Sequence, residues 1–131
     1  MNEKKRFYSM DSINEYMRNQ TELLYFITRK KWIPSRKTII RLCDELKEKP
    51  YMWKRNRLIP REVRITVVSH PYRSEFVLTY SPANHIDARY VMRIRTDDGG
   101  GRIYNNIFGF RDRDTESIYQ TIREQITGGW E

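Results

Sequence analysis

Residues 88–96 read ARYVMRIRT, and this alternation of apolar and charged side chains decides the fold class. A period of two residues is typical of a β-strand that buries only one face. The buried face is predicted to carry Tyr90, Met92 and Ile94. The opposite face carries Arg89, Val91, Arg93 and Arg95. Because one face is basic, the strand is expected in an antiparallel sheet with an exposed side.

Three further runs share this alternation, over residues 61–69, 74–81 and 102–110. Short turn-forming segments rich in proline, aspartate and glycine separate the runs. The spacing predicts a four-stranded antiparallel meander. A last helix is expected from Thr115 to about Ile126, because Ile118, Ile122 and Ile126 recur every fourth residue and Gly128-Gly129 stops the pattern.

Residues before Pro60 have helical periodicity instead. One apolar stripe runs from Ile13 to Ile27 and is consistent with one helix or with two short ones. A second amphipathic helix is predicted from Arg36 to Lys47, with Ser35 as its N-cap. The expected fold class is therefore α+β. A single domain of residues 1–131 is predicted, with a basic helical part (1–60) and a sheet with a C-terminal helix (61–131).

The positive charge is unevenly distributed. Residues 1–60 contain 15 lysines and arginines against 7 acidic residues, which equals the net charge of +8 of the whole chain. Residues 61–131 contain 10 arginines, 10 acidic residues and no lysine. A field concentrated in one half is typical of proteins that bind a polyanion or an acidic protein surface.

The segment Thr21–Leu46 resembles a helix-turn-helix or winged-helix reader of duplex DNA. In such motifs, polar and basic residues of the second helix reach base edges, and cations before the turn contact phosphates. The alternative is an ordinary helical hairpin with a solvated basic face. The residues predicted to read bases are Ser35, Arg36, Lys37, Thr38 and Arg41. The cations predicted to contact the phosphates of the DNA are Arg29, Lys30 and Lys31.

Residues 49–61 form a basic, aromatic connector and are the second candidate. Cations beside exposed rings suit single-stranded nucleic acid, and the same composition suits a wing that lies along a groove. Alternatively, Tyr51 and Trp53 pack the helices onto the sheet and only the cations are exposed. The cations assigned to binding are Lys54, Arg55 and Arg57.

Arginines on the third predicted strand are the third candidate. Arg89, Arg93 and Arg95 share one face, and Arg64 of the first strand is expected to join them. Guanidinium groups bind phosphate with two parallel hydrogen bonds. The favoured alternative is cross-strand pairing with Glu62 and Glu75.

No catalytic residue, metal ligand or cofactor is predicted. Asp97 and Asp98 precede three glycines and are interpreted as turn formers, and Asp112 and Asp114 as helix caps. A metal-dependent nuclease would need these four aspartates to converge. Cys43 lies within an apolar helical stripe and is interpreted as a packing residue.

Together these features favour a small non-enzymatic protein that binds nucleic acid, preferably duplex DNA, as a regulator or replication accessory. One alternative is a phage-type inhibitor that binds a host protein or a nucleic-acid-guided defence nuclease, and a second is the nuclease. A homodimer through the fourth strand or the C-terminal helix is possible by symmetry. With one cysteine and no long apolar run, a cytosolic location is expected, in a host cytosol if the protein is viral, without membrane contact.

Overall fold

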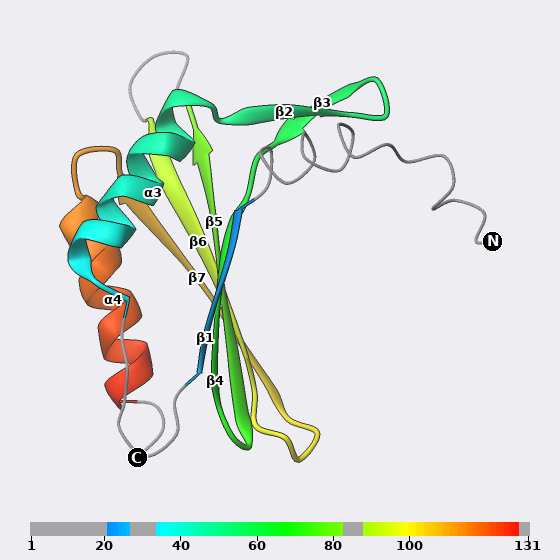
Figure 1. The fold of residues 1–131 in the computed structure, drawn as a ribbon, viewed down its shortest axis with the longest axis vertical. Helices are drawn as coiled ribbons and strands as arrows, with labels where there is room; N and C mark the ends of the chain where they lie inside the picture. Colours follow the sequence, from blue (N-terminus) through cyan, green and yellow to red (C-terminus); the bar gives the residue numbers. More distant parts are fainter. Residues whose placement is uncertain (1–20, 27–33, 83–87, 129–131) are drawn as a thin grey trace.

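The computed structural model describes residues 21–26, 34–82 and 88–128. The architecture is α+β, with a five-stranded mixed sheet, a separate two-stranded hairpin and two helices (Figure 1). In chain order the elements are β1 (Thr21–Phe26), α3 (Arg36–Glu48), β2 (Tyr51–Lys54), β3 (Arg57–Pro60), β4 (Val63–Ser69), β5 (Tyr72–Ser81), β6 (Arg89–Asp97), β7 (Ile103–Arg111) and α4 (Thr115–Gly128).

The predicted meander is confirmed. Strands β4 to β7 are antiparallel neighbours in chain order, and β1 adds to β4 in parallel, giving the order β1-β4-β5-β6-β7. In this register Phe76 lies between Ile65 and Ile94. The predicted apolar faces of β4, β5 and β6 are therefore one continuous buried surface.

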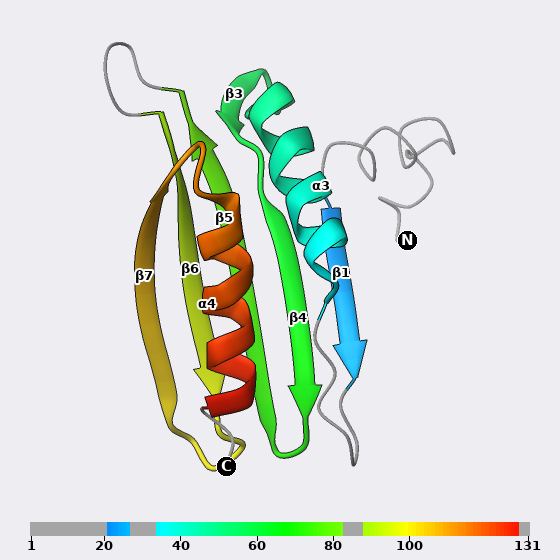
Figure 2. The same cartoon turned by 90° about the vertical axis from the view of Figure 1, so that its left-hand side faces the viewer.

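Both helices cover the same face of the sheet (Figure 2). Helix α3 begins after the predicted cap, where the Ser35 hydroxyl accepts a hydrogen bond from the Thr38 amide at 3.1 Å. Its buried residues and the three isoleucines of α4 fill the core, because residues four apart share one side of a helix. Neither described helix has the length and apolar character needed to cross a bilayer. We call the side of the sheet opposite the two helices the open face.

The helix-turn-helix prediction is wrong, because Thr21–Phe26 is a strand and not a helix. Residues 23–26 are consecutive apolar residues, a pattern that periodicity cannot assign to a strand or a buried helix. Pairing with β4 decides it, from Thr21 opposite Val63 to Phe26 opposite Val68. Residues 13–20 and 27 of the predicted first stripe lie outside the described residues.

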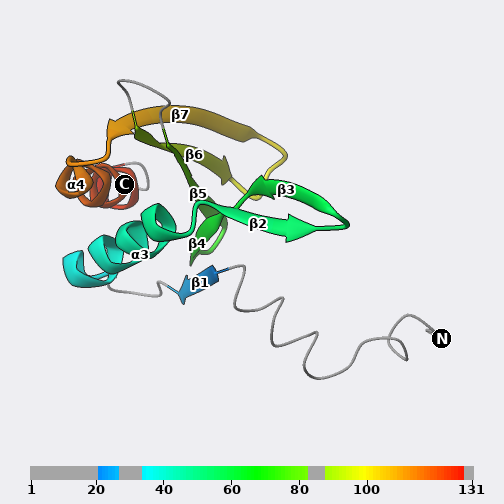
Figure 3. The ribbon, with the colours of Figure 1, turned by 90° about the horizontal axis from the view of Figure 1, so that it is seen from above.

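Within the predicted connector, residues 51–60 form a β-hairpin. Arg55 and Asn56 form a two-residue turn with φ of 52° and 61°, the left-handed conformation that closes tight hairpins. Seen from above, the hairpin extends away from the helices, on the side of the open face (Figure 3). We call β2, the turn and β3 the hairpin arm.

A buried hydrogen bond joins α3 to the middle of the sheet. The Tyr90 hydroxyl donates to the carbonyl oxygen of Cys43 at 2.7 Å, and both residues are buried. Burial raises the pKa of the Tyr90 phenol, so the group remains a neutral donor. The bond fixes the helix against β6 in one position.

Replacing Tyr90 by phenylalanine tests this bond. We expect Tyr90→Phe to lower the free energy of unfolding by about 1 kcal/mol, because one buried hydrogen bond is lost while the ring still packs. Urea denaturation followed by circular dichroism measures the change. Tyr51→Phe is the matched control, because Tyr51 is 43% exposed. An equal effect of the two substitutions would contradict the assignment.

Candidate nucleic-acid interface

The hairpin arm has two different sides. Residues that oppose one another across an antiparallel pair project to the same side. Trp53 opposes Leu58, and Met52 opposes Ile59. Met52 is buried, whereas Trp53 is 69% exposed and Leu58 is 55% exposed. The arm therefore turns Met52 toward the body of the protein and presents a ring and a leucine to solvent.

The exposed ring corrects one sequence interpretation. Trp53 does not pack the helices onto the sheet, and Tyr51 next to it is also exposed. Among the described residues, the large hydrophobic side chains that are exposed lie only on the hairpin arm and on β7. This exposure is concentrated and not random, which is typical of a binding surface.

Three cations surround the tip of the arm. Lys54 and Arg57 oppose one another in the last pair, and Arg55 lies in the turn between them. All three side chains are exposed. Within the described part of the chain, no carboxylate forms an ion pair with any of them. Three adjacent positive charges at the end of a narrow arm repel one another, and an anionic partner would relieve that repulsion.

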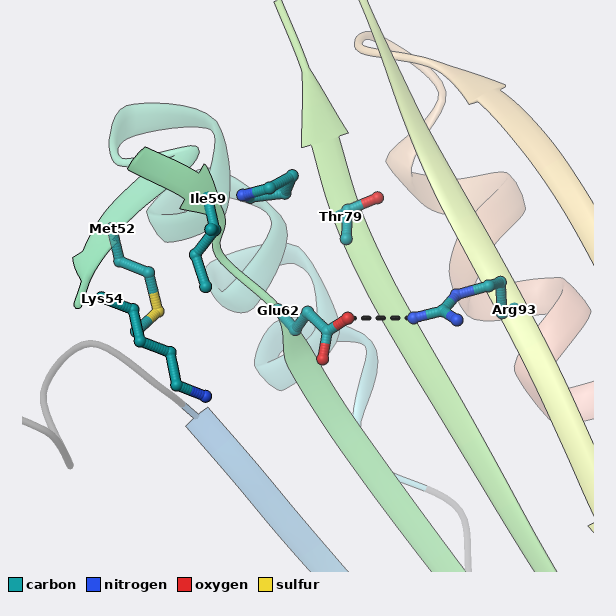
Figure 4. Close-up of a pocket in the computed structure, with 7 residues that line it drawn as sticks. Met52, Lys54, Ile59, Glu62, Thr79 and Arg93 are labelled. Atoms are coloured by element: carbon teal, nitrogen blue, oxygen red, sulfur yellow. Dashed lines mark hydrogen bonds and ion pairs between the residues drawn. The ribbon is translucent and has the colours of Figure 1, made fainter. Parts of the chain in front are cut away.

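A cavity of about 420 Å³ separates the arm from the open face. Met52, Lys54 and Ile59 line it from the arm, and Thr79 and Arg93 line it from the sheet (Figure 4). At its floor, an Arg93 Nη lies 2.9 Å from a carboxylate oxygen of Glu62. Lys54 of the arm and Arg93 of the open face therefore border one hollow.

The open face carries the predicted arginines, and half of their predicted pairing is observed. Glu62 forms ion pairs with Arg93 and, at 3.6 Å, with Arg64. Glu75 stands opposite Arg95 in the register without forming an ion pair.

The open face also holds a like-charged pair that sequence reasoning missed. Arg89 opposes Arg111 directly across β6 and β7. Like charges in this position are destabilising. Both arginines line a second hollow of about 290 Å³, which also borders on Gly109. Neither forms an ion pair with another described residue.

Several residues of helix α3, which the sequence predicted to read DNA bases, instead make contacts within the protein. Arg36 Nε lies 2.7 Å from a Glu116 oxygen, and its guanidinium group lies 5.0 Å from the centre of the Tyr119 ring. Ser35 and Thr38 are committed to the N-cap, where their hydroxyl oxygens are 2.7 Å apart. Lys37 and Arg41 are exposed. Arg29, Lys30 and Lys31 lie outside the described residues.

The arm and α3 are therefore separate surfaces. Helix α3 covers one face of the sheet, while the arm extends beyond the other face (Figure 1). The predicted site residues of α3 and those of the arm are not brought together. Arg61, the last cation of the basic connector, is buried and donates hydrogen bonds to the carbonyl oxygen of Glu45 and to the Thr21 hydroxyl.

The four aspartates of the nuclease alternative do not converge. Asp97 and Asp98 adjoin the start of β7, whereas Asp112 and Asp114 follow its end. A nine-residue strand separates the two pairs by about 30 Å. No group of three or more potential metal ligands occurs in the described ranges.

Cys43 is placed as a packing residue. Its side chain is buried, and burial, with a contribution from Asp44, raises the pKa of the thiol to about 12. At neutral pH the group remains a thiol, which is not the nucleophilic form.

No protein-family model matches the sequence, and neither a curated protein nor a solved structure is significantly similar to it. Leu58 and Arg111 belong to the candidate site although the sequence did not single them out. The sequence carries no clear signal for Leu58, because Tyr51-Met52-Trp53 and Leu58-Ile59 are consecutive apolar residues and Arg55-Asn56 contains no glycine.

The turn role of Asp98 predicts a pH dependence. Its Oδ1 accepts hydrogen bonds from the amides of Gly100 and Arg102, which hold the pKa of the carboxyl below its usual value. A lowered pKa in the folded state means stability that is present near neutral pH and lost on acidification. Asp98→Asn is expected to lower the free energy of unfolding at pH 7. The loss should become progressively smaller below about pH 4, the ordinary pKa of a carboxyl group.

Thermal melts of both proteins across this pH range measure the difference. Asp114→Asn is the control, since Asp114 is exposed and carries the same charge near the other end of β7. A destabilisation by Asp98→Asn that is independent of pH would contradict the role of the carboxylate.

Proposed function

We propose that this protein binds nucleic acid, with duplex DNA as the favoured partner, through the hairpin arm and the adjacent arginines of the open face. The observation that carries the proposal is the projecting two-stranded arm, which has three cations without an ion-pair partner among the described residues at its tip and exposed Trp53 on its side. No chemical step on the nucleic acid is part of the proposal.

The dimensions of the arm favour a duplex. A two-stranded β-ribbon fits the major groove, which is about 12 Å wide. Four residues per strand give the arm a length of about 13 Å. Lys54, Arg55 and Arg57 then meet phosphates, and Trp53 and Leu58 provide an apolar edge that can contact thymine methyl groups in the major groove.

The open face provides a second set of phosphate contacts. Arg93 of β6 borders the hollow beneath the arm, and Arg89 of the same strand opposes Arg111 of β7. A phosphate placed between Arg89 and Arg111 would replace their mutual repulsion by two charge-assisted hydrogen bonds. The two sets are on the same side of the sheet, so one polyanion would contact both.

Removing the cations of the tip tests the proposal. We expect the double variant Arg55→Ala/Arg57→Ala to weaken binding to a labelled duplex and to reduce the slope of log K against log salt by about 2, because each phosphate contact contributes roughly one unit. Fluorescence anisotropy at several salt concentrations measures both quantities.

The matched control is Lys37→Ala/Arg41→Ala. It removes the same number of exposed charges from α3, on the other face of the sheet. Binding should fall only slightly, through the smaller net charge. Loss of binding in this control and not in the arm variant would assign binding to α3. A wild-type protein that binds neither duplex nor single strand would refute the proposal.

Replacing Trp53 distinguishes binding to duplex DNA from binding to a single strand. We expect Trp53→Ala to weaken duplex binding by less than it weakens any single-strand binding, where one lost base stack costs about 1–3 kcal/mol. Parallel titrations with duplex DNA, single-stranded DNA and RNA measure this. If the single strand binds more tightly and Trp53→Ala lowers its affinity roughly tenfold or more, the partner is single-stranded.

The exposed apolar side of the arm also favours a second candidate, an inhibitor that binds an acidic protein surface. Trp and Tyr beside arginine are the residue types that dominate protein interfaces. In that case the protein is recovered with a single partner from host extract treated with nuclease, and free nucleic acid does not bind at physiological salt.

A further inference from the structure

Strand β7 is one of the two outer strands of the sheet, and its only charged residue is Arg111 at its end. It pairs with β6 without a bulge from Ile103 to Arg111. Its first eight residues, IYNNIFGF, include no charge and no proline, although 32% of the chain is charged. Natural edge strands are normally kept short, charged or bulged, because a free edge invites another strand to pair.

The side chains of β7 are exposed on both of its faces. Ile107 and Ile103 project on the open face and are 71% and 45% exposed. Tyr104 projects on the helix side and is 53% exposed, and Phe108 and Phe110 are half-buried there. A strand addition would cover both sets at the same time as the free backbone groups.

We propose that β7 pairs antiparallel with β7 of a second copy, about a twofold axis at Ile107. In this register Ile107 of one copy opposes Ile107 of the other. A residue that lies a given number of positions before Ile107 opposes the residue the same number of positions after Ile107 in the other copy. Tyr104 then meets Phe110, a favourable cross-strand aromatic pair. Arg102 of one copy opposes Asp112 of the other, which gives two opposite-charge pairs at the ends of the interface.

The charges and the faces favour this register over its neighbours. A slip of one residue places Arg102 opposite Arg111 or opposite Arg113, so like charges meet. The same slip turns the second copy over, because side chains alternate between faces. In the proposed register the two open faces lie on the same side, and the two five-stranded sheets become one continuous sheet. This inference does not depend on the proposed nucleic-acid function.

The occupant is a second copy because the edge is complementary to itself. The uncharged centre, residues 103–110, is flanked by Arg102 at one end and by Arg111 and Asp112 at the other. In the twofold register Arg102 opposes Asp112 and Arg111 opposes Ile103, so no like charges meet, and each contact occurs twice, as an isologous interface requires. Asp112 already lies 3.2 Å from Lys47, so Arg102 of the second copy adds a cation to an existing pair.

Sedimentation velocity over a wide range of protein concentration tests the proposal. We expect the wild-type chain to show a concentration-dependent dimer. Ile107→Lys should raise the dissociation constant roughly tenfold or more, because two lysines then meet at the axis. Ile107 is 71% exposed, so the monomer is expected to keep its fold, which circular dichroism verifies. Leu58→Lys adds the same charge at an exposed apolar residue of the arm and should leave the dimer intact.

A charge exchange tests the register. Arg102→Asp and Asp112→Arg should each weaken the dimer, and mixing the two variants should restore association as a heterodimer with both end pairs complementary. A wild-type chain that is monomeric at every concentration would overturn the proposal. So would a dimer that survives Ile107→Lys, or one that Leu58→Lys abolishes, since the contact would then lie elsewhere.

Discussion

The parallel pairing of β1 with β4 is the constraint on which the remaining structure depends. Two parallel neighbours cannot be joined by a tight turn, so the chain must cross a face of the sheet between them. Helix α3 makes this crossing and covers the apolar face. The chain then has to return to the sheet at Val63, where β4 pairs with β1, and the hairpin arm lies within that return. An arm that extends beyond the open face is thus a consequence of how β1 is added to the sheet.

Much of this fold could be predicted from local patterns. The strands of the meander alternate with a period of two, and α3 and α4 repeat their apolar residues at helical spacing, so each element carries its own signal. Strand β1 does not, because Leu23, Leu24, Tyr25 and Phe26 are consecutive apolar residues and only the distant partner β4 selects an extended chain. The hairpin arm has no clear local signal either, because the apolar residues of its two short strands are consecutive and its turn, Arg55-Asn56, contains no glycine.

The candidate site could be predicted only in part, because net charge does not say which cations remain unpaired. The described lysines and arginines of residues 34–60 fall into two groups in the folded protein. Arg36 and Lys47 of α3 contact Glu116 and Asp112, carboxylates that the sequence places about 65–80 residues away, so part of the predicted helical patch is neutralised. The cations of the arm have no such neighbours among the described residues. Separating the two groups requires the tertiary contacts between α3 and the C-terminal segment.

Exposed apolar side chains supply the complementary argument. Leaving a large side chain in water forgoes about 1.5–3 kcal/mol of burial, and the described part of the chain does so at two places only, the arm and β7. The two differ in charge. Three cations adjoin the apolar residues of the arm, whereas β7 is uncharged over eight residues. A polyanion suits the first surface, and an uncharged strand suits the second. Because β7 lies at the edge of the sheet and the arm extends beyond its face, the two surfaces can be occupied simultaneously.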